Sequence, residues 1–447
     1  MSSKAECVVA ASWVVPVQPA GVLRDHAVVI GGGRILELLP VTIARQRHPD
    51  LPFEEYPGHV LMPGLVNLHT HAAMALMRGF ADDLPLMEWL RHHVWPAEAR
   101  HLSARFVADG TRLACAEMLL GGITTFNDMY FFPEAVCAAA REVGLRVVAG
   151  LVAVDFPTPY APDATSALER GWATRQAFAG EPLVHFALAP HAPYTVGDEL
   201  FLRLAKLARE EGLRLHCHVH ETTAEIAGSL ETHGERPLAR LERLGVLGPG
   251  FIAVHCVHLD ANDIAMLAGH RVHVAHCPAS NLKLASGFAP TAALRAAGVN
   301  VGLGTDSAAS NNRLDLFGEL RLAALLAKGA TGDATVWDAT EALRAATLGG
   351  AEALGLADEI GSLESGKSAD LLAVDLSHPS LQPVFDPCSH LVHVAGREQV
   401  REVWVAGQRR VRQGQLVSGG GPGALSGTAL QSLAREWADR LRSTPVT

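Results

Sequence analysis

The feature of this sequence that most limits its fold is a repeated alternation of apolar runs and helix-rich stretches between residues 62 and 360. The intervening stretches are rich in Ala, Leu, Arg and Glu, as in residues 104–120 and 199–211. Eight strand-like runs occupy residues 65–69, 124–129, 146–154, 184–190, 214–220, 251–258, 271–277 and 299–304. This alternation predicts a parallel sheet, and eight such units predict a closed (β/α)8 TIM barrel in an α/β protein.

The two ends of the chain lack this alternation and predict a second, smaller domain. Residues 7–15 and 27–40 are typical of short strands, with a hairpin turn at Gly31 to Gly33. Short strands are also expected at 360–374, 389–394 and 400–417, so both ends would combine in a small β-sandwich. The expected domains are 1–61, 62–360, 361–420 and 421–447; the last contains a Gly/Ser-rich joint at 418–427 and an amphipathic helix at 430–441.

The bulk composition excludes several classes of protein. A net charge of −10 argues against a nucleic-acid binder, which needs concentrated basic charge. Seven cysteines are scattered without a Cys-x-x-Cys pair, which favours a reducing compartment and a cytoplasmic location. No uncharged stretch is long enough for a membrane-spanning helix, and Pro16 and Pro19 favour a first strand over a signal peptide.

The first strand of the predicted barrel ends in His69-Thr-His71. Side chains two residues apart on a strand point to the same side, so the two imidazoles would project together from one strand end. Paired neutral imidazoles begin a site for Zn²⁺ or a similar divalent ion. A lone His-x-His is weak evidence, so the interpretation depends on what the other strands supply.

Polar residues with suitable chemistry follow five further strands. A single histidine at a strand end is usually structural, but six strand ends facing one mouth of a barrel are not expected by chance. Three histidines and a carboxylate would hold a divalent ion and leave a position for water. These further residues are His191, His216, His218, His220, Glu221, His255, His258, His276 and Asp306.

Two of these residues are candidates for transferring protons during a reaction. Glu221 lies three residues after His218, where the chain can turn it towards the ion, and His255 is placed to take a proton from water.

Two-metal barrel hydrolases often bridge their ions with a carboxylated lysine on strand 4, and residues 183–190 contain no lysine. One ion is therefore favoured. Zinc is the default, and Fe²⁺ or Mn²⁺ would suit the same ligands.

The chain resembles the amidohydrolase superfamily, in its mononuclear aminohydrolase branch, and within that branch the 5′-methylthioadenosine/S-adenosylhomocysteine deaminases. The matching motifs begin with Met-Pro-Gly-Leu-Val-Asn-Leu-His-Thr-His at 62–71 and include Gly-Thr-Asp-Ser around Asp306. The others lie at 189–194, 218–222, 254–258, 276–284 and 369–371. The set spans the barrel and is more specific for the branch than for the substrate.

The resemblance implies a role for each matched residue. The implied metal ligands are His69, His71, His218 and Asp306, with Glu221 as proton shuttle and His255 as the electrostatic partner of the attacking water. Glu98, after strand 1, would hold the ribose hydroxyls, and His191 would lie near the sugar or purine. His216, deeper in the barrel, and His220, nearer the rim, are expected to be structural.

The activity implied by the resemblance is hydrolytic deamination of an adenosine-type nucleoside to its inosine analogue and ammonia. Glu221 would protonate N1 of the adenine, while Asp306 and His255 would help to take the water proton. Residues 147–166 contain no Lys or Arg, so an apolar methylthio group is favoured over the carboxylate of S-adenosylhomocysteine. A homodimer or higher homo-oligomer is expected, with a small-molecule substrate and neither nucleic-acid nor membrane partners.

Two rival interpretations remain open at this point. One is a deaminase of guanine, 8-oxoguanine, a pterin or a triazine on the same scaffold, against which Glu98 argues weakly because a free base has no ribose diol. The other is a barrel without catalysis that serves as a binding protein. The four filled ligand positions argue against it, and a metal assay with Glu221→Gln would discriminate.

Overall fold

The computed structural model describes residues 4–417 and 426–442, and packing divides them into two compact units. The first unit takes residues 4–67, 117–125 and 315–417, and the second takes 68–116, 126–314 and 426–442. The domain boundaries expected from the sequence, 1–61, 62–360, 361–420 and 421–447, follow the βα alternation rather than packing, and they stay a prediction.

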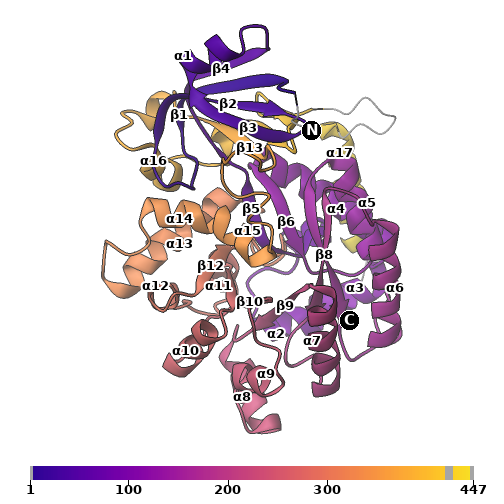
Figure 1. Cartoon of the computed structure of the whole chain (residues 1–447). Helices are drawn as coiled ribbons and strands as arrows, with labels where there is room; N and C mark the ends of the chain where they lie inside the picture. The colour runs from indigo at the N-terminus through magenta and orange to yellow at the C-terminus, as the bar shows by residue number, and fades with distance from the viewer. Residues whose placement is uncertain (1–3, 418–425, 443–447) are drawn as a thin grey trace. The chain divides into compact units, whose positions relative to one another are not determined.

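Eight strands form one sheet in sequence order, which confirms the predicted (β/α)8 barrel (Figure 1). Pairing from β7 through β12 is parallel throughout. Most strands are buried along their length, which explains why their sequences are apolar runs rather than alternating patterns. They are β5 (Leu65–Thr70), β6 (Ile123–Asp128), β7 (Arg146–Ala153), β8 (Val184–Pro190), β9 (Arg214–Val219), β10 (Phe251–His255), β11 (His273–His276) and β12 (Asn300–Leu303).

The barrel closes at the ends of its first and last strands. The backbone N–H of Asp306 donates to the carbonyl of His69 at 2.9 Å. Gly304 makes this approach possible, because a Cβ added there would lie 2.9 Å from both the backbone N and the Cβ of His69. Closure therefore brings a residue after the last strand beside the histidine pair of the first.

Helices cover the outside of the barrel, as expected from the Ala- and Leu-rich segments. Helices α5 and α6 contact β7, and α7 contacts β8 and β9 (Figure 1). The chain after β5 forms a run of short helices rather than an irregular loop. The helices between β5 and β12 are η1 (Ala72–Met77), α2 (Leu86–Trp89), η2 (Leu90–Val94), α3 (Trp95–His101), α4 (Ala104–Leu120), α5 (Pro133–Val143), α6 (Ala164–Ala177), α7 (Asp198–Glu211), α8 (Thr223–His233), α9 (Pro237–Arg243), α10 (Ala261–Gly269), α11 (Pro278–Lys283) and α12 (Thr291–Ala296).

The strands from both chain ends form a second, mixed sheet, as predicted. Its order is β16-β15-β14-β13-β4-β1-β2-β3, and the predicted hairpin joins β2 to β3 through Gly32 and Gly33, both with positive φ. A Cβ at Gly407 would lie 2.8 Å from the Cα of Gly33, so the turn after β14 lies against the turn after β2. The sheet therefore curves around an apolar core. The strands are β1 (Cys7–Val14), β2 (Leu23–Gly31), β3 (Arg34–Pro40), β4 (Phe53–Pro63), β13 (Leu371–Asp375), β14 (Val400–Val405), β15 (Gln408–Arg412) and β16 (Gln415–Leu416).

The expected strand at 389–394 is wrong, because residues 389–393 belong to helix α16 (Pro387–His393), and the strand expected at 360–374 is confined to β13 (Leu371–Asp375). Asp386 caps the start of this helix by accepting from the N–H of Cys388, and Pro387 occupies its first position. Asp followed by Pro is a helix-start signal that outweighed the short apolar pattern. The remaining helices of this unit are α1 (Val41–Arg47), α13 (Leu316–Thr331), α14 (Ala339–Ala345), α15 (Leu348–Leu354), η3 (Pro379–Leu381) and η4 (Arg397–Gln399).

The predicted C-terminal helix is present as α17 (Gly427–Arg442) in the second unit. Trp437 anchors it by packing on Phe106 and donating its indole N–H to Asp109 at 3.0 Å. The expected joint at 418–427 lies almost wholly outside the described residues. No helix in the described ranges has the length and apolarity required to cross a membrane.

Candidate active site

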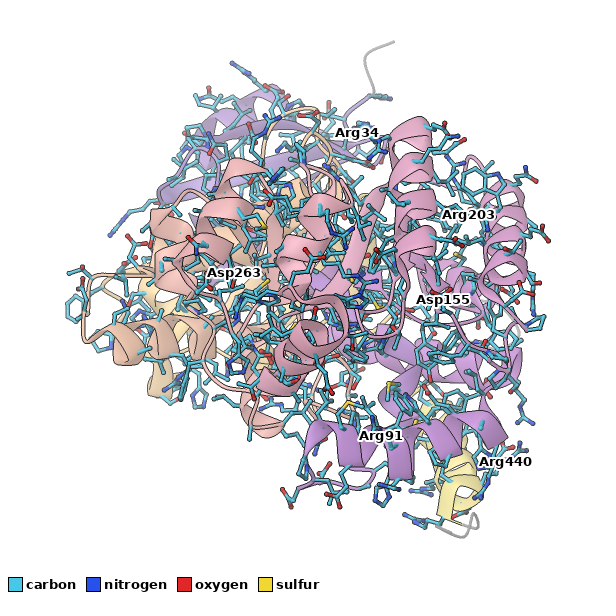
Figure 2. All side chains as sticks on the ribbon, turned by 90° about the horizontal axis from the view of Figure 1, so that it is seen from below. Arg34, Arg91, Asp155, Arg203, Asp263 and Arg440 are labelled. Atoms are coloured by element: carbon cyan, nitrogen blue, oxygen red, sulfur yellow. The ribbon has the colours of Figure 1, made fainter. Side chains whose placement is uncertain are left out.

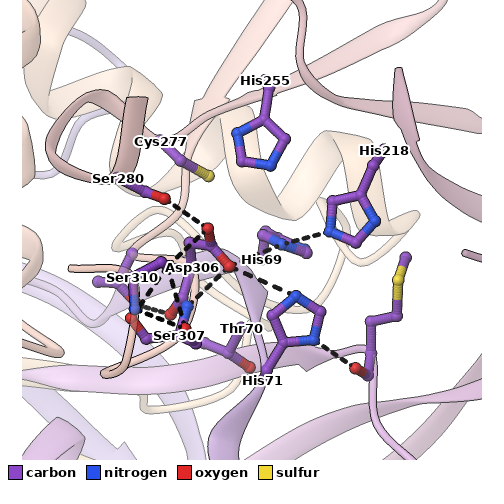
Figure 3. Close-up of polar contacts among 12 residues, drawn as sticks. His69, Thr70, His71, His218, His255, Cys277, Ser280, Asp306, Ser307 and Ser310 are labelled. Atoms are coloured by element: carbon purple, nitrogen blue, oxygen red, sulfur yellow. Dashed lines mark hydrogen bonds and ion pairs between the residues drawn. The ribbon is translucent and has the colours of Figure 1, made fainter. Parts of the chain in front are cut away.

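Four side chains from three places in the second unit meet at the mouth of the barrel. His69 and His71 end β5, His218 lies near the end of β9, and Asp306 follows β12 (Figure 3). The Oδ1 atom of Asp306 lies 3.3 Å from His69 Nε2 and 3.4 Å from His71 Nε2, and His218 Nε2 lies 3.2 Å from His69 Nε2. These four residues are called the metal cluster below.

Backbone carbonyls fix which imidazole nitrogens face the centre of the metal cluster. His71 donates its Nδ1–H to the carbonyl of Met129 at 2.6 Å, and His218 donates its Nδ1–H to the carbonyl of His191 at 2.7 Å. A carbonyl can only accept, so the neutral imidazoles keep a lone pair on Nε2. Such hydrogen bonds commonly orient metal-binding histidines.

Asp306 is fixed as firmly as the histidines. Its Oδ2 accepts from the hydroxyls of Ser280 at 2.6 Å and Ser310 at 2.8 Å, while its Oδ1 accepts from the N–H of Ser307 at 2.7 Å (Figure 3). Burial opposes ionisation, but the hydrogen-bond contact with His69 outweighs it and holds the pKa of Asp306 well below its ordinary value. Asp306 therefore offers an anionic oxygen to the histidines.

The backbone is strained where these side chains leave the strands. His255 has φ 71° and Asp306 has φ 58°, both in the left-handed region that non-glycine residues rarely adopt. Such conformations cost roughly 1–3 kcal/mol each and cluster at functional sites. The sharp turns direct both side chains into the mouth of the barrel.

The donor set fits a divalent cation. Nε2 atoms of two neutral imidazoles only 3.2 Å apart present lone pairs to each other, and this arrangement is unfavourable unless a cation or proton lies between them. Burial lowers the pKa of His69 to about 4, so its imidazole is neutral, as a metal ligand must be. Ligand atoms of His69, His71 and Asp306, and of His69, His218 and His255, lie within 4.8 Å of one another. The chain thus contains a His-His-Asp metal site.

Glu221 and His255 lie beside the metal cluster and are buried. His255 Nε2 lies 3.8 Å from Glu221 Oε1, and His255 Nδ1 donates to Asn281 Oδ1 at 2.9 Å. Burial raises the pKa of Glu221, which favours its protonated form. Burial opposes charge on His255, but the carboxylates of Glu221 and Asp306 outweigh it and raise the pKa of His255.

A cavity of about 320 Å³ leads to the metal cluster. Its wall is mainly apolar and is called the substrate wall: Leu86, Trp89, Leu90, Val94, Trp95, Phe131 and Phe156. The half-buried carboxylate of Glu98 on α3 also lines this cavity and accepts from the hydroxyl of Tyr130 at 2.6 Å. Burial raises the pKa of Glu98, while the Tyr130 hydrogen bond acts in the opposite direction.

A second cavity of about 700 Å³ shares Leu86, Trp95, Phe156, Tyr194 and Glu221 with the first. Among the described residues, the lining of the first cavity contains no Lys or Arg. The second cavity is lined by Arg91 and Asp155, whose positions on η2 and after β7 are visible in Figure 2. The cationic side chains of Arg91 and Arg240 therefore line the second cavity and not the one that reaches the metal cluster.

The structure brings together the residues expected to bind the ion, the substrate or the transferred protons. One cavity is lined by His71, Glu98, His191, His218, Glu221, His255 and Asp306, and His69 lies directly behind them. His191 is held by Thr195 Oγ1, 3.0 Å from its Nδ1.

The other strand-end histidines lie in contacts within the fold. His216 Nε2 lies 2.9 Å from His69 Nδ1, deeper in the barrel. His220 accepts from the N–H of Leu238 at 3.2 Å, and His258 donates to the carbonyl of Ser286 at 2.7 Å. The carbonyl of His276 accepts the N–H of Gly304 at 2.9 Å.

Sequence reasoning missed several residues that support the site. Tyr130 follows strand β6, which ends in Asn127-Asp128 rather than in histidine and so attracted no attention. Glu225 accepts from the backbone N–H groups of His220 and Glu221. The signal for Glu225 was available, because Thr222-x-x-Glu225 is a helix-start pattern.

Comparison with protein families gives one match that covers most of the chain. The amidohydrolase family matches residues 60–410. A 5-methylthioadenosine/S-adenosylhomocysteine deaminase of Teredinibacter turnerae is 46% identical over 435 residues, which cover 96% of this chain and 96% of the relative.

Solved structures agree with the fold and carry zinc. An adenosine deaminase from Xanthomonas campestris with bound zinc is 47% identical, with a TM-score of 0.96 over 99% of this chain and 100% of that one. An atrazine chlorohydrolase from Arthrobacter aurescens complexed with zinc is 25% identical, with a TM-score of 0.88 over 97% of this chain and 100% of that one.

Proposed function

The chain belongs to the amidohydrolase family, and we propose that it hydrolytically deaminates adenosine-type nucleosides, with 5′-methylthioadenosine as the preferred substrate. The observation that carries this proposal is the half-buried carboxylate of Glu98, which lines the same cavity as the metal cluster. A carboxylate there can accept hydrogen bonds from the two hydroxyls of a ribose, which a free purine base lacks. The names of the relatives support the same substrate class.

We assign His69, His71, His218 and Asp306 as ligands of one divalent ion. Zinc is the first choice because the similar Xanthomonas structure carries it, and Fe²⁺ or Mn²⁺ suits the same donors. An ion held there would lower the pKa of bound water to about 7 and so supply hydroxide at neutral pH.

The neighbouring side chains carry the proton transfers. Glu221, whose protonated form is favoured by burial, delivers a proton to N1 of the adenine ring, so that negative charge does not build up there. His255 Nε2, together with Asp306, accepts the proton of the attacking water. His191 contacts the sugar or purine. The amino group takes up the proton that His255 and Asp306 accepted and leaves C6 as ammonia, while the hydroxyl on C6 returns a proton to Glu221.

The substrate wall supports a preference for 5′-methylthioadenosine over S-adenosylhomocysteine. A methylthio group gains by burial against Trp89, Trp95 and Phe156. The amino-acid carboxylate of S-adenosylhomocysteine would lose its hydration without a cation in this cavity, since Arg91 lines only the second one.

We extend the proposal to the setting of the enzyme. A homodimer or higher homo-oligomer is the commonest arrangement for enzymes of this kind. A cytoplasmic location fits the scattered cysteines, which form no disulfide in the described part of the chain and of which six are buried.

The test is a deamination assay of the zinc-loaded protein, followed by the ultraviolet change from adenine to hypoxanthine. S-adenosylhomocysteine, adenosine, guanine, 8-oxoguanine, a pterin and a triazine are measured beside 5′-methylthioadenosine. We expect the highest kcat/KM with the methylthio compound. Turnover of a free base without turnover of any adenosine would overturn the substrate assignment and leave the metal chemistry in place.

A further inference from the structure

Glu225, on α8, is a buried carboxylate to which the proposed reaction gives no role. Its Oε1 accepts the backbone N–H of His220 at 2.9 Å, and its Oε2 accepts the backbone N–H of Glu221 at 2.8 Å. The residue is only 8% exposed. Each carboxylate oxygen therefore accepts from one of two consecutive backbone amides. The second amide belongs to Glu221, the proposed proton donor to the substrate.

The backbone at these two amides is not an ordinary strand end. His220 has φ 56°, a left-handed conformation that a non-glycine residue adopts only when its surroundings hold it there. This turn lets the chain leave β9 and directs Glu221 towards His255. A change in the turn would rotate the Glu221 side chain about its own backbone.

The start of α8 also has an ordinary helix cap, which differs from the contacts of Glu225. Thr222 Oγ1 accepts the N–H of Glu225 at 3.2 Å and so caps α8. In an ordinary capping box the glutamate reaches back to the N-cap residue itself. Here Glu225 reaches past Thr222 to the two residues before it, so its hydrogen bonds hold the turn rather than the helix.

We infer that Glu225 is a positioning residue that fixes the backbone of Glu221 and thereby aims its carboxyl at the substrate. The inference rests on the proposed role of Glu221 as proton donor. Only a group with two acceptor atoms can satisfy both amides. A glutamine of the same shape would turn an NH₂ group towards one of the N–H groups, so that two donors would face each other.

The experiment compares Glu225→Gln with Thr222→Ala, which removes the helix cap but leaves both turn hydrogen bonds. We expect Glu225→Gln to lower kcat by about 10- to 100-fold, because small misplacements of a reacting group cost this much. KM and bound zinc should stay near their wild-type values. Thr222→Ala should lower Tm and change kcat by less than about threefold, since a lost cap acts on stability.

A double-mutant cycle with Glu221→Gln tests whether Glu225 acts through Glu221. If it does, adding Glu225→Gln to Glu221→Gln should lower kcat by less than about twofold, because coupled residues are not additive. The inference is overturned if Glu225→Gln retains kcat within threefold of wild type, or loses the same factor in both backgrounds. The cycle uses whichever substrate the wild type turns over, so failure of the substrate assignment is a separate result.

Hydrogen exchange gives a readout that does not depend on turnover. Peptides covering residues 216–224 should exchange their amides faster in Glu225→Gln than in the wild type, and Thr222→Ala should leave the amides of His220 and Glu221 protected. If Glu225→Gln is not recovered folded, Glu225→Asp is used, whose shorter side chain keeps the charge but reaches the two amides less well. Unchanged exchange in the folded variant would contradict the positioning role.

Discussion

The metal cluster and the substrate wall lie in the same unit and line the same cavity, but they are built in opposite ways. The cluster residues sit at strand ends, and each is held by a further contact, such as His71 on the carbonyl of Met129 or Asp306 on Ser280 and Ser310. The substrate wall comes from the short helices α2, η2 and α3 and from segments after β6 and β7, and it is mostly apolar.

The difference teaches how the two tasks are divided. Catalysis needs atoms held within fractions of an ångström, which rigid strand ends and second contacts provide. Substrate choice needs a surface whose shape and polarity can differ between relatives, which helices and loops outside the barrel provide. Changes in the metal cluster should therefore lower kcat for every substrate, whereas changes in the substrate wall should alter the ranking of substrates.

The largest effect is expected from Asp306→Asn. Loss of the anionic ligand should reduce bound zinc and lower kcat/KM by at least about 10³-fold with every substrate, because the ion supplies the activated water. Metal content and steady-state rates check this, with Asp155→Asn in the second cavity as a control that keeps both. An Asp306→Asn protein with full zinc and more than a tenth of the activity would contradict the ligand assignment.

The next effect concerns the carboxylate of Glu98, which lines the cavity beside the substrate wall. Glu98→Ala should lower kcat/KM for 5′-methylthioadenosine by roughly 100-fold, because a site built to accept hydroxyl hydrogens loses its partner. The 2′,3′-dideoxy analogue should be affected by less than about threefold, since it has no diol to bind. Equal losses with both compounds would show that Glu98 acts on something other than the ribose, and bound zinc should stay unchanged throughout.

A cation introduced into the substrate wall should change the ranking of substrates by a smaller factor. Phe156 lines both cavities, and Phe156→Arg should raise kcat/KM for S-adenosylhomocysteine relative to 5′-methylthioadenosine by about tenfold. Phe156→Ala removes the ring without adding charge, and it should not favour the homocysteine compound. If both variants shift the ratio equally, the space in the cavity, rather than the lack of a cation, limits the turnover of S-adenosylhomocysteine by the wild type.

The smallest effect is a shift in pH dependence. Burial raises the pKa of Glu98 and the Tyr130 hydroxyl lowers it, so Tyr130→Phe should raise this pKa further. Because only the ionised carboxylate accepts from both ribose hydroxyls, KM should rise as pH falls through the pKa of Glu98. In Tyr130→Phe this rise should begin at a higher pH, with kcat changed less than KM; profiles of KM from about pH 5 to 9 check it. An unmoved profile would mean that Tyr130 does not tune Glu98.

Much of the barrel and of the metal cluster could be predicted because the relevant signals are local. In β5, and again in β9, the apolar run and the histidines at its end lie within a few residues of each other in the sequence. The rule that parallel strands point their ends at one mouth then brings His69, His218 and Asp306 together without further information. Residues 389–394 show where a local pattern fails. The short apolar run there predicted a strand, but the helix-start signal Asp386-Pro387 made it part of α16.

The sequence by itself determined the order of strands and helices, the residues at the strand ends and hence the class of chemistry. Tertiary structure alone decided which side chains support these residues from other strands: Tyr130 on Glu98 and His216 behind His69. The reason is physical. Periodicity and turn preferences act between near neighbours in the chain, whereas these contacts need positive-φ turns and close packing between separate elements, which exist only once the barrel has closed.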